Sequence, residues 1–210
     1  MSYFPFFREI EGEKCLVIGG GKVAARKISR LKEFGVKIKV VAPSIVSDIE
    51  AMAQACDNIS VERRIITPQD IENADFVIAA AGEEADKEAA RLCKERSIPV
   101  NVVDNQELCD FIFPSIIRKG DMVAGFVTGG KSPHVAAKIR RDCEMNISDN
   151  IEDILDYLAR IRKLAKDRIS DERKRAAYIR EVSEFCMKAD RVCSNKEENA
   201  FLQKYLDNRS

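Results

Sequence analysis

The sequence predicts an α/β protein in which a parallel sheet is followed by an antiparallel segment and then by a helical C-terminal domain. Over residues 1–112, short apolar stretches alternate with helical patterns, which is typical of a parallel sheet. Two extended stretches then flank a short turn, which indicates an antiparallel hairpin. From Ile151 onward, apolar residues recur at helical spacing. We therefore expect three regions, at residues 1–112, 113–145 and 146–210.

A glycine-rich turn joins the first predicted strand to the first predicted helix. The apolar residues after Lys14 lead into Gly19-Gly20-Gly21-Lys22-Val23-Ala24, a G-x-G-x-x-A sequence. In such a motif Gly19 permits the tight turn, Gly21 lets the backbone approach a pyrophosphate, and Ala24 lets the helix pack closely on the strand. Because a strand and a helix flank the motif, it predicts a Rossmann-type nucleotide-binding domain. A turn of the same shape without a ligand is the alternative.

The elements after this turn alternate regularly. The helical pattern runs from Val23 to Leu31 and stops before Gly35. The further expected elements are a strand at 36–41, a helix at 47–55, an extended stretch at 59–66, a strand at 76–81, a helix at 83–96 and a strand at 100–103. Strands that alternate with helices in this way form a parallel sheet.

The second half of the chain has a different pattern. Extended stretches at 113–118 and 122–128 flank Lys119-Gly120-Asp121, a hairpin-type turn. Ser132 and Pro133 suit the N-cap and first position of a helix expected to run through Arg140. Two apolar stripes at helical spacing follow, indicating core or contact between subunits: Ile151, Ile154, Leu155, Leu158, Ile161 and Ala165, then Tyr178, Val182, Phe185 and Met187. The basic segment 160–175 is either a solvated helix face or a surface for a polyanionic small molecule.

Composition narrows the classes of function. The 35 basic and 35 acidic side chains give a net charge of zero, so overall charge favours neither nucleic acid nor a membrane as partner. The seven cysteines form no C-x-x-C pair and are odd in number, which is typical of reduced thiols in a cytoplasm. No targeting sequence or membrane-spanning apolar run is recognisable, so we expect a cytoplasmic protein.

Five motifs occur in a fixed order along the chain: Phe4-Pro5-Phe6, Gly19 to Ala24, Asn101-Val102-Val103-Asp104, Phe111-Ile112-Phe113-Pro114-Ser115 and Thr128-Gly129-Gly130-Lys131-Ser132-Pro133. In this order they resemble the siroheme-synthase family, specifically its precorrin-2 dehydrogenase module. The resemblance implies NAD⁺-dependent oxidation of precorrin-2 to sirohydrochlorin by a homodimer, and in some members insertion of ferrous iron as a substrate. Larger homologues carry a fused methyltransferase domain, to which nothing here corresponds, so we expect the module alone.

The resemblance assigns catalysis to Asp104, and in bifunctional members chelation as well. Asp104 follows the strand at 100–103 at its carboxyl end, where open parallel sheets bind their ligands. Its carboxylate is ionised near neutrality and suits a proton acceptor. From the residues alone, Asp104 is more simply interpreted as a carboxylate of an ordinary turn.

The expected cofactor contacts come from two loops, and the residues are Gly19, Gly21, Lys22, Val23, Ala24, Pro43 and Ser44. The second strand ends in Val41-Ala42-Pro43-Ser44, without the acidic residue that usually binds the ribose of NAD. The preference for NAD⁺ over NADP⁺ therefore rests on the resemblance. A second departure is Ala81, where relatives commonly have a threonine beside the cofactor.

The expected substrate contacts are Thr128, Gly129, Ser132 and His134. The glycines and the following helix could present N–H groups to the carboxylates of a tetrapyrrole, while a plain helix entry is the alternative. His134 is the only histidine, and its role stays open. We expect no resident metal, because no cluster of histidines and cysteines has the spacing of a zinc or iron–sulfur site. A nucleotide-sensing module without catalysis is the alternative function.

Overall fold

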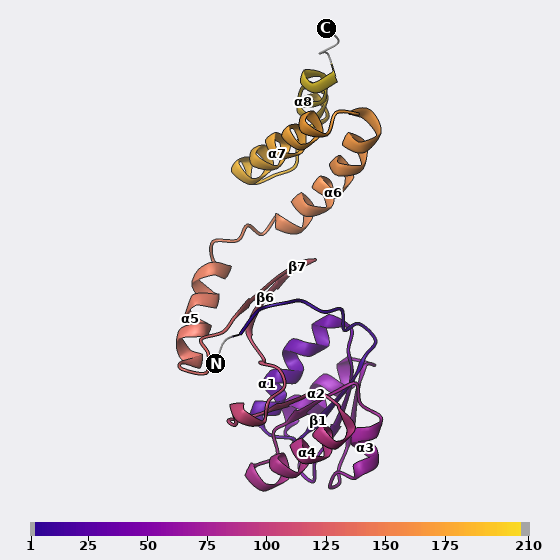
Figure 1. Cartoon of the computed structure of the whole chain (residues 1–210), viewed down its shortest axis with the longest axis vertical. Coiled ribbons are helices and arrows are strands. Elements are labelled where there is room, and N and C mark those ends of the chain that lie inside the picture. The colour runs from indigo at the N-terminus through magenta and orange to yellow at the C-terminus, as the bar shows by residue number, and fades with distance from the viewer. Residues whose placement is uncertain (1–2, 207–210) are drawn as a thin grey trace. The chain divides into compact units, whose positions relative to one another are not determined.

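The computed structural model describes residues 3–206, which divide into two compact units (Figure 1). Unit 1 contains the chain up to Pro114 together with Val127–Pro133. Unit 2 contains Ser115–Phe126 and the chain from His134 onward. The two units are groups of residues that contact one another, and they do not test the functional boundaries expected from the sequence. The division into three regions therefore stays a prediction.

Unit 1 is built on a parallel sheet of five strands, in the order β3-β2-β1-β4-β5. The strands are β1 (Lys14–Ile18), β2 (Lys37–Val41), β3 (Ile59–Glu62), β4 (Phe76–Ala79) and β5 (Val100–Val102). The order reverses between β1 and β4, so the carboxyl ends of these two strands form the switch point at which such sheets bind nucleotides. The predicted Rossmann-type sheet is confirmed.

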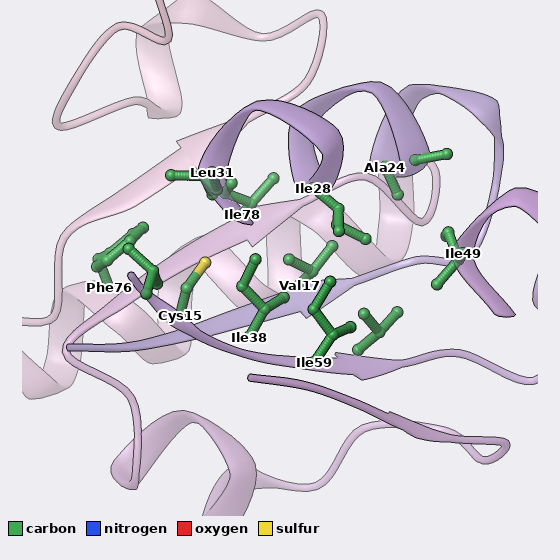
Figure 2. Close-up of a cluster of buried hydrophobic side chains, with 13 residues drawn as sticks. Cys15, Val17, Ala24, Ile28, Leu31, Ile38, Ile49, Ile59, Phe76 and Ile78 are labelled. Carbon is green, nitrogen blue, oxygen red and sulfur yellow. The ribbon is translucent and has the colours of Figure 1, made fainter. Parts of the chain in front are cut away.

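Two helices cover each face of this sheet. Alternate residues of β1 point to opposite sides, so Val17 packs under α1 (Lys22–Leu31) and α2 (Ser47–Ala55), as Figure 2 shows. Leu16 packs on the other side, under α3 (Pro68–Glu72) and α4 (Glu83–Arg96). Each fully buried aliphatic side chain of this kind stabilises the fold by about 1.5–3 kcal/mol. These two hydrophobic cores hold the sheet in place. The candidate site lies at the carboxyl ends of its strands.

The expected extended stretch at 59–66 was too long, because β3 ends at Glu62. Arg64 turns toward α3, and its Nη1 donates a hydrogen bond of 2.7 Å to Oδ2 of Asp70. The sequence analysis missed α3, although its signals are present: Thr67 and Asp70 form a capping box, and Pro68 occupies the first turn. The strands expected at 76–81 and 100–103 also end earlier, at Ala79 and Val102.

Unit 2 contains the predicted hairpin and four helices. Strands β6 (Ser115–Lys119) and β7 (Met122–Phe126) pair antiparallel, which confirms the change of pattern in the sequence. The helices are α5 (Pro133–Glu144), α6 (Ile151–Arg168), α7 (Glu172–Ala189) and α8 (Asn195–Leu206). Helix α5 continues four residues beyond the expected end at Arg140.

The core of unit 2 contains most of the two predicted apolar stripes, including Ile154, Ile161, Tyr178 and Val182. Leu155 and Met187 are the exceptions, with 36% and 56% of their surfaces exposed. Among the described helices, none is both long enough and apolar enough to cross a membrane.

Candidate active site

Of the three glycines in the turn after β1, two lie against neighbouring backbone and the third faces open space. A Cβ atom at Gly19 would overlap the carbonyl oxygen of Ala80, and one at Gly20 would overlap that of Ser44. Gly19 also has φ +115°, which strongly disfavours any side chain. At Gly21, by contrast, a Cβ would meet no atom within 4 Å. The turn therefore presents bare backbone at Gly21.

Helix α1 begins directly behind this opening. Gly21 is its N-cap, and no side chain caps the helix there. The first N–H groups of a helix have no partner within the helix and form its positive end. Lys22 is exposed, Val23 half-buried and Ala24 buried, so the small Ala24 keeps α1 close to the sheet. Uncapped N–H groups beside open space suit the pyrophosphate of a dinucleotide.

The loop after β2 lies against the glycine turn. Val46 donates a backbone hydrogen bond of 2.9 Å to the carbonyl of Gly20. Pro43 and Ser44, the two expected ribose contacts, are both exposed in this loop. Their contact with the adenosine ribose stays a prediction.

Asp104 sits in a turn that leaves β5 at its carboxyl end. Its φ is +59°, a conformation that aspartate adopts more readily than most residues. The residue is exposed, and within residues 3–206 its carboxylate has no hydrogen bond or ion pair. The preceding turn residue is fixed, because Val103 N donates to the carbonyl of Ala79 at 2.9 Å. The Asp104 carboxylate therefore lies exposed beyond the carboxyl end of β5, without a hydrogen-bond or ion partner in the described residues.

After this turn the chain returns along the outer edge of β5. Oδ2 of Asp110 accepts the N–H of Val100 at 3.0 Å, and Sγ of Cys109 accepts that of Val102 at 3.1 Å. The Cys109 thiol lies 3.2 Å from the carbonyl of Val102. The side chains of Cys109 and Asp110 therefore bind the outer edge of β5 as a sixth strand would. They anchor the return segment, residues 105–113, which follows the Asp104 turn.

Lys27 of α1 is a residue that the sequence analysis missed. Its Nζ donates a hydrogen bond of 2.8 Å to Oδ1 of Asn101 on β5, and lies 4.3 Å from the ring centroid of Phe113. Asn101 in turn donates from Nδ2 to the carbonyl of Phe111 at 2.9 Å. Burial lowers the pKa of Lys27 to about 8, a shift that the charge of Asp104 opposes. A lysine at one position of an apolar helix face was the available signal.

Asp86 is the second residue that the sequence analysis missed. This buried side chain of α4 accepts the backbone N–H groups of Ala81 and Gly82, at 2.8 and 3.2 Å. Burial raises its pKa, and the negative charge of Asp104 raises it further. The turn after β4 is thus held by a carboxylate five residues after Ala81.

The loop at 128–132 reaches the Asp104 turn within unit 1. Thr128 Oγ1 donates to the carbonyl of Ser132 at 2.9 Å and accepts its N–H at 3.2 Å, which closes the loop. A Cβ at Gly130 would overlap Oε1 of Gln106, two residues after Asp104. Gln106 Nε2 also donates to the hydroxyl of Tyr3. The sequence analysis did not single out Gln106, because a glutamine in a loop carries no signal of its own.

Two of the expected substrate residues remain apart from these contacts. Gly129 is exposed, and a Cβ there would meet nothing within 4 Å. His134 is exposed and belongs to unit 2, where it begins the second of the two segments, and its side chain has no hydrogen bond or ion pair among the described residues.

Comparisons with known proteins bear on this arrangement. A family model described as "Putative NAD(P)-binding" matches residues 6–115, the part that holds the glycine turn and Asp104. The siroheme synthase of Nitrosococcus oceani is 31% identical over 201 residues, 95% of this chain and 42% of the relative. That of Thioalkalivibrio sulfidiphilus is 36% identical over 85% of this chain and 36% of its own length. The chain therefore spans less than half the length of these relatives.

A solved structure gives the same fold over the full length. The structure of SirC, a precorrin-2 dehydrogenase, matches with a TM-score of 0.71 and 20% identity, covering 97% of this chain and 98% of that chain. This likeness agrees with the parallel sheet, hairpin and helices described above. Since the family model matches more than half of the chain, the chain belongs to this NAD(P)-binding family, and it is homologous over most of its length to part of the siroheme synthases.

Proposed function

We propose that this chain is a precorrin-2 dehydrogenase, which oxidises precorrin-2 to sirohydrochlorin with NAD⁺ in siroheme biosynthesis. The observation that carries the proposal is the unpaired carboxylate of Asp104, at the same edge of the sheet as the open glycine turn. The names of the siroheme synthase relatives and of SirC support the same reaction.

The cofactor fits the residues present. Uncapped N–H groups at the start of α1 and the bare backbone at Gly21 would hold a pyrophosphate, with Lys22, Val23 and Ala24 in the first turn. Pro43 and Ser44 would lie beside the adenosine ribose. When bound, NAD⁺ supplies the hydride acceptor. We propose NAD⁺ rather than NADP⁺ as the preferred cofactor.

Asp104 performs the complementary step. Removing a hydride from the reduced tetrapyrrole leaves a proton to be taken up, and an exposed carboxylate accepts it and passes it to water. The strand end and the cysteine-held return segment fix the position of this group. Because the proton acceptor is already held in position, orienting it costs little entropy during the reaction.

The substrate is bound by the loop at 128–132. The Gly129 backbone and the side chains of Thr128 and Ser132 in this loop would contact the acetate and propionate groups of the tetrapyrrole, and we propose the same role for the side chain of His134 in α5. The contact between Gly130 and Gln106 supports this assignment, because it brings the loop to the Asp104 turn.

The finer proposals concern metal, assembly and compartment. We propose that ferrous iron is a second substrate, inserted into sirohydrochlorin with the help of Asp104, and that the chain works as a homodimer. The cytoplasm is the proposed compartment, because all seven cysteines are free thiols. Cys186 and Cys193 stay unpaired although their sulfur atoms lie 3.9 Å apart.

The test is an anaerobic assay of purified protein with precorrin-2 and NAD⁺. Nicotinamide reduction and tetrapyrrole absorbance are followed together, first without and then with ferrous ion, and NADP⁺ replaces NAD⁺ in a parallel series. We expect coupled signals before metal is added, and a further metal-dependent change above the enzyme-free rate. Folded protein that binds NAD⁺ but reduces none of it would contradict the dehydrogenase and favour a nucleotide-sensing module. Equal turnover with NADP⁺ would contradict the cofactor preference.

A further inference from the structure

Lys27 is an unusual residue for its place on α1. The buried positions on the same helix are Ala24, Ala25, Ile28 and Leu31, which belong to the hydrophobic core on this face of the sheet. An apolar side chain at residue 27 would continue this face without removing an ammonium from water. The desolvation of the half-buried Lys27 instead lowers the stability of the folded state. The presence of a lysine here calls for a role beyond packing.

The contacts of Lys27 link the two halves of the proposed site. Helix α1 begins at the glycine turn, and the Nζ of Lys27 binds Asn101, three residues before Asp104. Through Asn101 Nδ2 the link continues to the carbonyl of Phe111, and through the aromatic face to Phe113. The ammonium group of Lys27 therefore connects α1, which begins at the glycine turn, to the return segment beside the Asp104 turn.

Charge supports the same link. The groups that face Lys27 are Arg26 on its own helix, Cys15 on β1, Cys109 on the return segment and Asp104 on the turn. Of these, only Asp104 is a carboxylate, and it favours the ammonium form of Lys27. The Asp104 carboxylate forms no ion pair within the part of the chain that the structure describes.

We propose that Lys27 is a positioning residue for Asp104: its ammonium fixes the β5 strand end through Asn101 and supplies the positive charge that the Asp104 carboxylate faces. Lys27 does not touch the substrate in this scheme. Its kinetic consequence rests on the proposed function, whereas its interaction with Asp104 does not.

The first experiment needs no substrate. Protein labelled with ¹³C and ¹⁵N at lysine is titrated by NMR, and the Lys27 signal is assigned by its loss in Lys27→Met. We expect this lysine to lose its proton near pH 8, and at lower pH in Asp104→Asn, because the carboxylate favours the ammonium. Asp57→Asn, an exposed carboxylate of the same unit, serves as control and should leave the titration unchanged. An unchanged titration in Asp104→Asn would overturn the proposal.

The second experiment measures catalysis. We expect Lys27→Met to lower kcat about tenfold or more, with KM for NAD⁺ within twofold, because the carboxylate is displaced while the glycine turn stays intact. Lys27→Arg, which keeps the charge, should recover most of kcat and move the alkaline fall in activity from near pH 8 to higher pH. Equal losses in Lys27→Met and Lys27→Arg, with the same pH profile, would reduce Lys27 to packing. If the wild type reduces no NAD⁺, the proposed function fails, and the NMR titration alone decides the role of Lys27.

Discussion

Asp70 and Asp104 both belong to unit 1, and the structure treats their charges in opposite ways. Oδ1 of Asp70 accepts from Arg64 Nη2 at 2.7 Å and from Lys39 Nζ at 3.0 Å, and Oδ2 accepts the N–H of Thr67 at 2.9 Å. The hydrogen bonds from Arg64 above all hold the pKa of Asp70 well below its usual range. Asp104 has no such partner in the described chain, and one distant ammonium faces it.

The comparison distinguishes carboxylates that stabilise the fold from carboxylates that are available for a reaction. A carboxylate whose oxygens are all bound holds elements together, as Asp70 joins α3 to β2. A carboxylate fixed by its backbone but left without partners is available for a proton or a ligand. Each experiment below asks whether a group belongs to the first kind or to the second.

The largest expected effect is the loss of activity in Asp104→Asn. The amide keeps the size of the side chain and tolerates the φ of +59°, but it accepts no proton. We expect turnover of precorrin-2 to fall about a thousandfold, within the range for loss of a general base. Unfolding in urea and NAD⁺ affinity, measured on the same sample, should match the wild type. Asp121→Asn, in the hairpin turn, is the matched control and should stay active.

The second prediction concerns pH and Lys27. Burial lowers its pKa to about 8 from 10.5, so between these values the unfolded chain holds a proton that the folded chain has lost. Folding is therefore favoured as pH rises through this window. The free energy of unfolding of the wild type, relative to Lys27→Met, should increase by up to about 3 kcal/mol from pH 7 to pH 10.5. Urea unfolding of both proteins checks this, and a constant difference would contradict it.

The third prediction breaks the charge cluster around Asp70. Asp70→Asn removes a charge whose side chain is 4% exposed and leaves Glu62 as the remaining shared partner of Arg64 and Lys39. We expect a loss of about 2 kcal/mol in the free energy of unfolding at pH 7. The loss should shrink below about pH 3.8, where the unfolded wild-type aspartate takes up its proton. Glu50→Gln, in the exposed pair with Arg63, should cost less than about 1 kcal/mol.

The smallest expected effect separates the filled from the open part of the glycine turn. Gly21→Ala adds a methyl group in open space, at a φ of −86° that alanine adopts freely, so the stability should not change. The methyl group would stand where a pyrophosphate approaches, and we expect Kd for NAD⁺ to rise about tenfold, or 1.4 kcal/mol. Calorimetric titration measures it. Gly20→Ala is the contrast and should destabilise the fold, because its Cβ would overlap Ser44.

The Rossmann-type sheet and the place of the glycine turn were predictable because both depend on short-range patterns. Apolar strands, a Gly19-Gly20-Gly21 turn and a helix with Ala24 at its start each leave a local signal. The hairpin was predictable for the same reason, since Gly120 separates two extended stretches. The resemblance then supplied Asp104, which no local pattern distinguishes from a turn residue.

The residues that sequence analysis missed act over long distances in the chain. Lys27 and Asn101 are 74 positions apart, and only the parallel crossover brings them together. Gln106 meets Gly130 through a loop that leaves unit 1 and returns to it. Asp86 is closer, but its bonds to two backbone N–H groups depend on how α4 begins. Such contacts follow from topology, which periodicity alone does not give.

The cysteine-held edge of β5 has a consequence for how the protein behaves in a crowded solution. An edge strand normally offers a row of unpaired N–H and C=O groups to which the strand of another molecule can add. Here the N–H groups of Val100 and Val102 are already bound by Asp110 and Cys109, and the strand is only three residues long. The same side chains that hold the Asp104 turn therefore protect the β5 edge of the sheet from edge-to-edge aggregation, and oxidation of Cys109 would weaken both at once.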